Sequence, residues 1–294
     1  MLTLTGITLK SGRKTWLKDV SFTAQARRIT GIVGPRGSGK TELARVIMGL
    51  VEPDSGTVTL EGHELGYGDR QNFGYLPAER GGYPSMKVLE QIVYFARLHG
   101  MTMGAAERNA VTLLARLDLS DRAYAPLSHL SGTEVARVDI AAILAADPDV
   151  VVLDEPFDGL DAASAEKVFD LLRDHADSGV PVVFTSDSWD LTQAAADDII
   201  VLSRGAIAQQ GTLDELRADH RSYRVDFADE SAATAAEAHL AASPGVTSVR
   251  RTGTRVLVEA ADVDSAGAAV SGLPGLRGFT TVEPSLAELF KEKV

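Results

Sequence analysis

Eight residues between a short apolar run and a helical pattern have the composition of a phosphate-binding loop. Residues 34–41 read GPRGSGKT, which matches G-x-x-x-x-G-K-[ST]; they follow ITGIV and precede TELARVIMGL. Glycines suit such a loop because backbone N–H groups must wrap around phosphate oxygens at positive φ, and the N-terminus of the next helix favours anions. A chance glycine-rich turn is the alternative, but the flanking strand and helix patterns favour nucleotide binding. The predicted binding residues are Gly34, Pro35, Arg36, Gly37, Ser38, Gly39, Lys40 and Thr41.

Two side chains of this loop and two carboxylates further along the chain could act on the phosphates. Lys40 would reach the β- and γ-phosphates, and the hydroxyl of Thr41 would hold Mg²⁺. Residues 150–155 read VVVLDE, an apolar strand that ends in Asp154 and Glu155. Asp154 would coordinate Mg²⁺ directly or through water, and Glu155 would polarise the attacking water. A strand followed by a solvated acidic turn explains the same letters, and this short motif alone leaves both interpretations open.

Composition limits the classes of protein to which these motifs can belong. The chain has 294 residues, a formal net charge of -12 and no cysteine. This acidic balance disfavours nucleic acid as the main partner, and the lack of cysteine excludes disulfides and thiolate metal sites. No apolar run approaches the roughly 18 residues that span a bilayer, and the start MLTLTGITLK lacks the pattern of a secretion signal. We therefore expect a cytoplasmic chain.

The elements that must position these motifs alternate between apolar strand patterns and helical patterns, which predicts an α/β fold. LTLTGITLK, DVSFTAQ, RITGIV, GTVTLEG and NFGYLP are predicted to form an antiparallel layer, and residues 87–117 to form helices of a separable insert. VVVLDE and PVVFTS return to strands, and IIVLSRGAIAQQG predicts a hairpin that turns at Gly205. The predicted first domain is a P-loop NTPase core over residues 1–221, with the helical insert at about residues 80–135.

The pattern changes near residue 222. From SYRVDF to LRGFTTVE the predicted order is β-α-β-β-α-β, the split βαβ arrangement, followed by a last helix in SLAELFKEKV. Residues 222–294 are therefore predicted to form a small C-terminal accessory α+β domain.

A third motif resolves the ambiguity of VVVLDE. LSGTE at residues 130–134 opens a helix and precedes VVVLDE by about twenty residues, and GLD follows at residues 159–161. With these motifs in order, residues 1–221 resemble the ATP-binding subunits of ABC transporters. The resemblance implies ATP and Mg²⁺ as cofactors, an ATPase activity, and a dimer in which one subunit's helix start contacts the γ-phosphate held by the other. It assigns nucleotide contacts to Ser131, Gly132 and Asp161.

The remaining segments narrow the resemblance. GYLPAERGGYPSMKVLEQIVYFARLHG and the closing PSLAELF look like the exporter branch whose ATPases carry a small C-terminal domain. This implies a separate pair of membrane permease subunits, so that the chain would lie on the inner face of the cell membrane. A second ATP-binding subunit, identical or different, is the other implied partner.

Two departures from the family concern the nucleotide base and the metal. The aromatic residue that stacks on adenine aligns with Ser11, so the platform is absent unless Trp16 or a neighbour replaces it; a core position for Trp16 is the alternative. The glutamine that links Mg²⁺ to the membrane subunit aligns with Ala78, which has no oxygen to offer. Glu79 could substitute, or it could be an ordinary exposed carboxylate.

Two further departures concern the γ-phosphate. Thr133 stands where LSGTE would usually have a second glycine, and Asp187 in VFTSDSW replaces the family's histidine. An ionised aspartate cannot donate a hydrogen bond. The alternative role for Asp187 is to cap the helix SWDLTQAAADD. Two hypotheses follow: an active motor that powers export, or a slow or non-hydrolysing half of a heterodimer.

Overall fold

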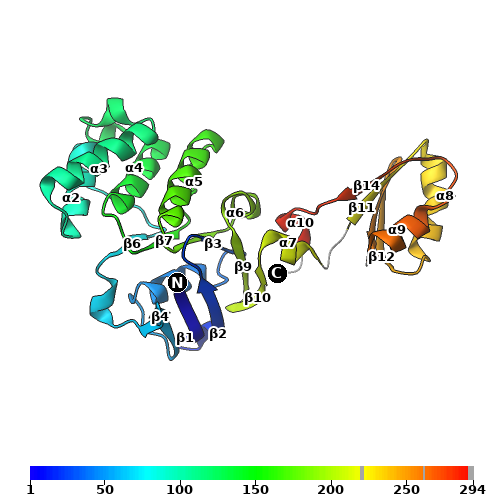
Figure 1. Cartoon of the computed structure of the whole chain (residues 1–294), viewed down its shortest axis with the longest axis horizontal. Coiled ribbons are helices and arrows are strands. Elements are labelled where there is room, and N and C mark those ends of the chain that lie inside the picture. The colour runs from blue at the N-terminus through cyan, green and yellow to red at the C-terminus, as the bar shows by residue number, and fades with distance from the viewer. Residues whose placement is uncertain (219–221, 261, 291–294) are drawn as a thin grey trace. The chain divides into compact units, whose positions relative to one another are not determined.

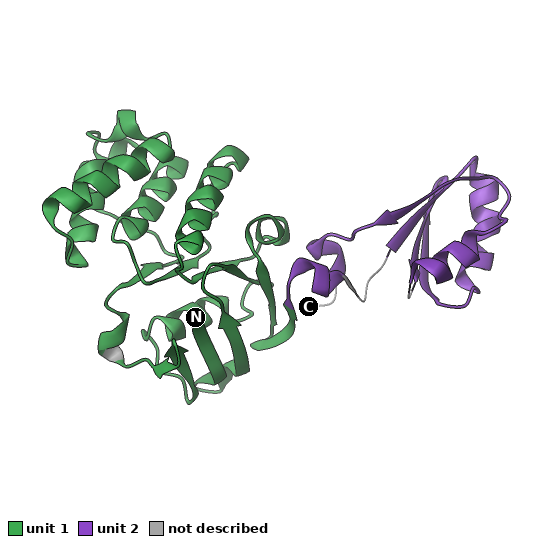
Figure 2. Ribbon diagram, viewed as in Figure 1, with its two compact units in different colours: residues 1–210, 294 green, residues 211–293 purple. Residues whose placement is uncertain are grey.

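The computed structural model describes residues 1–218, 222–260 and 262–290. The chain divides into two compact units, residues 1–210 and residues 211–293 (Figure 2). In the first unit a six-stranded sheet runs in the order β10-β9-β3-β8-β7-β6. Its central strands β3 (Ile29–Val33), β7 (Val150–Asp154) and β8 (Val182–Ser186) are buried along their whole length and pair in parallel. Continuous apolar strands of this kind are expected where both faces of a parallel sheet are covered.

The two faces of this sheet carry two different cores. Along β7, Val150 and Val152 pack with helix α1 (Lys40–Ile47) and the antiparallel layer, whereas Val151 and Leu153 pack with α5 (Ala162–Asp177) and the insert. Figure 1 shows helices α2 to α5 on one side of the sheet and β1, β2 and β4 on the other. The mixed α/β core with its P-loop, as predicted, is confirmed.

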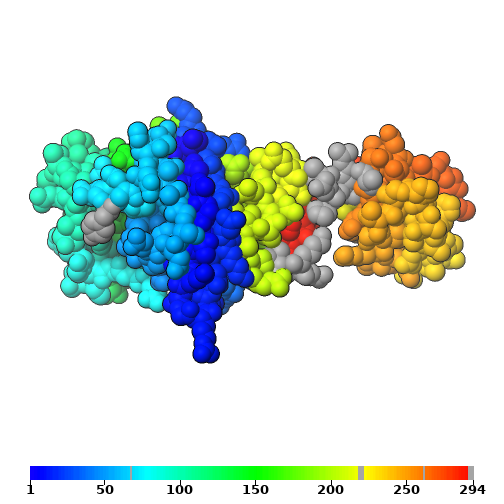
Figure 3. Space-filling view, turned by 90° about the horizontal axis from the view of Figure 1, so that it is seen from below, coloured from blue at the N-terminus to red at the C-terminus, as the bar shows by residue number. Residues whose placement is uncertain are grey.

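The antiparallel layer is smaller than predicted. It has the order β2-β1-β4-β5, with bounds Lys14–Ala24, Leu2–Ser11, Ser55–Leu60 and His63–Glu64. The N-terminal residues that form β1 and β2 lie as a blue band over part of the face of the first unit seen in Figure 3. The prediction was wrong for RITGIV and NFGYLP, because β3 pairs in parallel with β8 and β9, and β6 (Phe73–Leu76) pairs in parallel with β7. All of β3 and most of β6 are buried, as is expected for strands of a parallel sheet that is covered on both faces.

Three helices contact one another: α2 (Val88–Leu98), α3 (Met103–Arg116) and α4 (Gly132–Leu144). Helices α2 and α3 lie within the insert predicted at about residues 80–135, whereas α4 begins near its end and extends beyond it. The first two confirm the helices predicted within residues 87–117. Helix α4 also contacts β6 and α5, which joins the insert to the parallel sheet. Short 3-10 turns occupy Tyr67–Arg70, Ser120–Arg122 and Leu127–His129.

The predicted hairpin is confirmed as β9 (Asp198–Ser203) and β10 (Ala206–Gly211). Its turn has φ 47° at Arg204 and φ 81° at Gly205, as a tight hairpin turn requires. A Cβ on Gly205 would lie 2.3 Å from the backbone oxygen of Trp16. The N–H of Gly205 donates to the carbonyl of Ser38 over 2.9 Å, so the hairpin tip supports the phosphate-binding loop.

The second unit has a four-stranded antiparallel sheet in the order β12-β13-β11-β14. Its element order is the predicted β-α-β-β-α-β; the last four residues of SLAELFKEKV lie outside the described residues. Val225, Val256 and Val258 pack against α8 and α9 in its core. The elements are α7 (Leu213–Ala218), β11 (Ser222–Phe227), α8 (Glu230–Ala241), β12 (Val246–Thr252), β13 (Arg255–Ala260), α9 (Val263–Val270), β14 (Leu276–Val282) and α10 (Leu286–Phe290).

Within the described ranges, no helix has the length and apolar character needed to cross a membrane.

Candidate nucleotide-binding site

The GPRGSGKT loop connects the end of β3 to the start of α1. Gly37 and Gly39 have φ 79° and φ 109°, conformations that residues with a Cβ rarely adopt. A Cβ on Gly34 would lie 2.1 Å from the carbonyl oxygen of Leu202, so close packing also requires glycine there. No side chain caps α1, which leaves its first N–H groups for an anion.

Lys40 is 6% exposed and lies against its own loop. Its ammonium donates to the carbonyl of Gly34 over 2.8 Å and to that of Pro35 over 3.4 Å, and it lies 3.6 Å from a carboxylate oxygen of Glu155. The hydroxyl of Ser38 is buried and has no hydrogen-bond partner in the structure. The loop thus places a buried positive charge and an unpaired hydroxyl where phosphate oxygens would bind.

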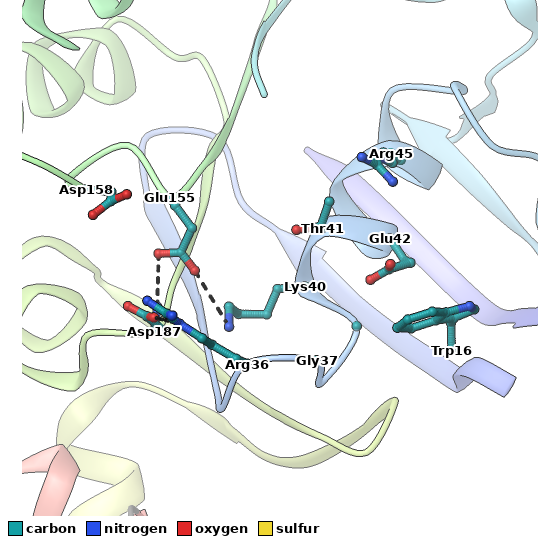
Figure 4. A pocket seen from close by; sticks show the side chains of 11 residues that line it. Trp16, Arg36, Gly37, Lys40, Thr41, Glu42, Arg45, Glu155, Asp158 and Asp187 are labelled. Atoms are coloured by element: carbon teal, nitrogen blue, oxygen red, sulfur yellow. Dashed lines mark hydrogen bonds and ion pairs between the residues drawn. The ribbon is translucent and has the colours of Figure 1, made fainter. Parts of the chain in front are cut away.

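A cavity of about 440 Å³ lies between this loop and the ends of β7 and β8. Glu155, Asp187 and Arg36 lie at one end of it and Trp16 lies at the other, with Lys40 between them (Figure 4). Its lining residues are Trp16, Arg36, Gly37, Gly39, Lys40, Thr41, Glu42, Arg45, Glu155, Asp158 and Asp187. The cavity therefore has one end suited to a terminal phosphate and one end with an aromatic surface.

The carboxylate pair of VVVLDE lies at the phosphate end. Asp154 is fully buried; one of its oxygens accepts a hydrogen bond from the hydroxyl of Thr185, and the other has no partner in the part of the chain that the structure describes. An unpaired buried carboxylate oxygen suits a hard cation such as Mg²⁺, which prefers oxygen ligands. The donor set at Asp154 and Thr41 therefore fits the metal that the motifs imply.

Glu155 has an unusual backbone conformation, with φ 51°. Its N–H donates to Thr185 Oγ1 over 3.1 Å. Burial raises the pKa of its carboxyl, and the positive charge of Lys40 opposes the rise. Non-glycine residues in the left-handed region cost about 1 to 2 kcal/mol and concentrate at functional sites.

Asp187 occupies the end of β8 and closes the phosphate side of the cavity. Its carboxylate lies 3.0 Å from Nε of Arg36, and its backbone N–H donates to Glu155 Oε2 over 3.1 Å (Figure 4). The helix-cap alternative is wrong, because the hydroxyl of Ser188 accepts from the N–H of Leu191 and caps α6 (Trp189–Ala195). Asp187 precedes the N-cap position and turns toward the cavity instead.

The other predicted nucleotide contacts lie outside this cavity. Ser131 caps α4 and shares a capping box with Glu134, while Asp161 caps α5 by accepting from the N–H of Ser164 over 2.8 Å. A Cβ on Gly132 would meet no atom within 4 Å, so the start of α4 is open. Thr133 donates to the carbonyl of Gly159 over 3.0 Å and joins the LSGTE and GLD segments.

Several residues of the site were not singled out from sequence. Glu42 and Arg45 line the cavity, and Arg45 follows Thr41 by four residues, a helical spacing that could have revealed it. Thr185 donates to the carboxylate of Asp154, and Arg80 donates to the backbone carbonyl of Glu155. Both residues come from distant parts of the chain, and no local sequence pattern marks them.

Trp16 has a position that is compatible with both alternatives left open by the sequence, a core residue and a surface for the base. It is half-buried, packs against the core of the antiparallel layer and also lines the cavity. The ammonium of Lys14 lies 3.0 Å from the centroid of its ring.

Comparison with known proteins finds relatives of both units. A family model for ABC transporter matches residues 17–158, and a model for the C-terminal domain of DrrA1-3-like ATP-binding proteins matches residues 211–294. An uncharacterized ABC transporter ATP-binding protein of Alkalihalophilus pseudofirmus is 33% identical over 268 residues, which cover 90% of this chain and 98% of that protein. The daunorubicin resistance ATP-binding protein DrrA3 of Streptomyces coeruleorubidus is 32% identical over 228 residues, 76% of this chain and 72% of its own length.

The fold has solved counterparts as well. The dimeric structure of an ATP-binding cassette in a post-hydrolysis state, bound to ADP and Pi, matches with a TM-score of 0.65 and 24% identity. The match covers 72% of this chain and 98% of that one.

Proposed function

This chain belongs to the ATP-binding proteins of ABC transporters and carries a DrrA-like C-terminal domain, and on that premise we propose that it binds and hydrolyses ATP to power export through a separate membrane permease. The observation that carries the proposal is the cavity in which the loop at residues 34–41 faces Glu155, 3.6 Å from the ammonium of Lys40. The relatives of this chain include a daunorubicin resistance ATP-binding protein and a Nod factor export ATP-binding protein, which supports a role in export.

Each residue of the cavity has a part in this proposal. Lys40 leaves the loop carbonyls and pairs with the β- and γ-phosphates, which lie on the open N-terminus of α1. Thr41 and Asp154 hold Mg²⁺, which neutralises phosphate charge when it is bound. Glu155 orients the attacking water and accepts its proton, and its raised pKa suits it to act as a general base.

Dimerisation is the second part of the proposal. Ser131, Gly132 and Asp161 lie outside the cavity of their own chain, so nucleotide contacts from them require another subunit. The open start of α4 supplies N–H groups for such a contact. The dimeric ADP-bound cassette with the same fold supports this arrangement. In the assembly that we propose, the two subunits lie on the inner face of the cell membrane against the permease.

A slow or non-hydrolysing half of a heterodimer is a second candidate, because Asp187 brings a carboxylate to the phosphate end of the cavity. The ion pair between Asp187 and Arg36 also engages a guanidinium that could otherwise bind a phosphate. Ala78 also favours this candidate, because it stands where the family has a glutamine and offers no side-chain oxygen to Mg²⁺. The measured rate of the purified chain separates this candidate from an active motor.

Binding at the loop is tested by thermal unfolding of the chain with and without MgATP. ATP at about a hundred times its Kd should stabilise the parent by about 2.7 kcal/mol and raise its Tm by several degrees. Lys40→Ala should lose this shift. Lys87→Ala, which removes an exposed lysine of the insert, is the matched control and should keep it. An equal shift in Lys40→Ala would place the nucleotide elsewhere.

Trp16 should stack on the adenine, because its ring forms the end of the cavity opposite Glu155. Aromatic stacking on a base contributes about 1 to 3 kcal/mol, so Trp16→Ala should weaken ATP binding about 5- to 160-fold, and Trp16→Phe much less. In a Trp189→Phe background the remaining tryptophan fluorescence reports Trp16 alone, and ATP should quench it. If Trp16→Ala bound ATP with the affinity of the parent, Trp16 would be a core residue that does not contact the base.

A further inference from the structure

Arg80 holds the backbone that carries the proposed general base. It lies in the loop between the end of β6 at Leu76 and the start of α2 at Val88. One guanidinium nitrogen, Nη2, donates to the carbonyl of Glu155 over 2.8 Å and to that of Pro156 over 2.9 Å. The arginine and these carbonyls are about 75 residues apart in sequence, so the contact joins two separate loops.

The conformation of Glu155 explains why such a contact matters. With φ 51°, the residue is held in a region that costs about 1 to 2 kcal/mol for a side chain with a Cβ. Such strain persists when surrounding contacts fix the backbone. Thr185 accepts from the N–H of Glu155, and Asp158 of the same turn donates to its carbonyl over 3.2 Å. Arg80 adds a charged donor to that carbonyl from outside the turn.

The same arginine lies near the helical insert. Asp139 on α4 is 6% exposed, and one of its carboxylate oxygens has no hydrogen-bond partner among the described residues. Burial raises the pKa of Asp139 to about 6, and the positive charge of Arg80 opposes the rise. The charge of Arg80 therefore acts on a buried carboxyl of the helix that begins at LSGTE, while its guanidinium contacts the turn that bears Glu155.

We propose that Arg80 is a positioning residue that fixes the strained turn at Glu155 and couples this turn to the loop between β6 and α2. The proposal rests on the proposed ATPase function only for its effect on rate. At Ala78 the loop between β6 and α2 has no side-chain oxygen that could bind a metal. Arg80, two residues later, connects this loop to the nucleotide site through the backbone carbonyl of Glu155 instead. Arg80 itself touches neither nucleotide nor water in this role.

The effect on rate is measured in steady-state ATP hydrolysis by Arg80→Ala, Arg80→Lys and the control Arg108→Ala, an exposed arginine of the insert. A displacement of about 1 Å at a catalytic group can cost 100-fold. Arg80→Ala should therefore lower kcat about 10- to 100-fold and leave the Kd for ATP within about twofold of the parent value. Arg80→Lys should recover part of kcat, and Arg108→Ala should match the parent.

A double-variant comparison separates positioning from a general loss of folding. If Arg80 acts through Glu155, then adding Arg80→Ala to Glu155→Gln should lower the single-turnover rate by less than about twofold. Independent, multiplying losses in rate would overturn the proposal. Equal losses of ATP affinity and of kcat in Arg80→Ala would also overturn it.

Amide hydrogen exchange tests the same contact without any hydrolysis. The N–H of Asp158 is bonded to the carbonyl that Arg80 holds, so exchange in residues 155–160 should be faster in Arg80→Ala than in the parent or Arg108→Ala. Unchanged exchange in this segment would contradict the proposal. A parent chain that hydrolyses no ATP would refute the proposed function, whereas the exchange result would still decide the role of Arg80.

Discussion

Replacing Glu155 with glutamine is expected to lower ATP turnover about 100-fold or more and to leave ATP binding intact. General-base catalysis contributes about 10²- to 10⁴-fold, and glutamine keeps the shape of the side chain without its ability to accept the proton. The carboxylate of Glu155 lies 3.6 Å from the ammonium of Lys40, which we propose to pair with the β- and γ-phosphates. Glu155 is therefore close enough to the phosphates to act on an attacking water. Phosphate release is the measure of turnover, and fluorescence or calorimetric titration is the measure of binding.

Glu42→Gln is the matched control for this experiment. Glu42 lines the same cavity from the first turn of α1, on the side of Lys40 away from Glu155 (Figure 4). Loss of its charge should therefore change turnover by less than about threefold. Parent-like turnover in Glu155→Gln would mean that another group activates the water.

Replacing Asp187 with histidine is expected to raise the rate of the purified chain at least several-fold. Two like charges 4 Å apart repel by roughly 4 kcal/mol at an effective dielectric constant of 20, and this is an upper bound because the Asp187 side chain is 40% exposed. Histidine removes this repulsion of the γ-phosphate and supplies an N–H donor. It also releases Arg36, whose guanidinium can then approach the phosphate.

Asp187→Ala separates these effects, because it removes the charge without supplying a donor. If repulsion alone slows the parent, both variants should be faster to the same extent; if the donor matters, histidine should exceed alanine. The ion pair of Arg36 and Asp187 lies at the surface and contributes little to stability, so neither variant should unfold. Rapid ATP hydrolysis by the parent chain, or an equal rate in Asp187→His, would show that Asp187 does not slow hydrolysis.

The loop and the carboxylate pair could be predicted from sequence because both are contiguous motifs next to strong strand patterns. GPRGSGKT and VVVLDE each specify a backbone geometry over a few residues, so the cavity between Lys40 and Glu155 follows once β3 and β7 lie in one parallel sheet. The hairpin at Gly205 was predictable for the same reason. Its support of Ser38 was not, because that contact joins residues far apart in the chain.

The contacts that hold Glu155 could not be predicted because they depend on which loops the sheet brings together. Thr185 lies beside Asp154 because β7 and β8 are in parallel register, and Arg80 reaches the same turn from the loop after β6. The possible cap of α6 suggested by the sequence, Asp187, also lies one residue before the actual cap, Ser188. Asp187 and Ser188 are both good caps, and only the geometry shows that the serine makes the bond.

The most direct test of the ATPase assignment is single-turnover phosphate release from MgATP mixed with an excess of the purified chain, beside the same mixture with Lys40→Ala. We predict a slow but complete release of one phosphate per bound ATP by the parent, and no release above background by Lys40→Ala. Equal release by both proteins, or no release by a parent that binds ATP, would contradict the assignment of this cavity as an ATP-hydrolysing site.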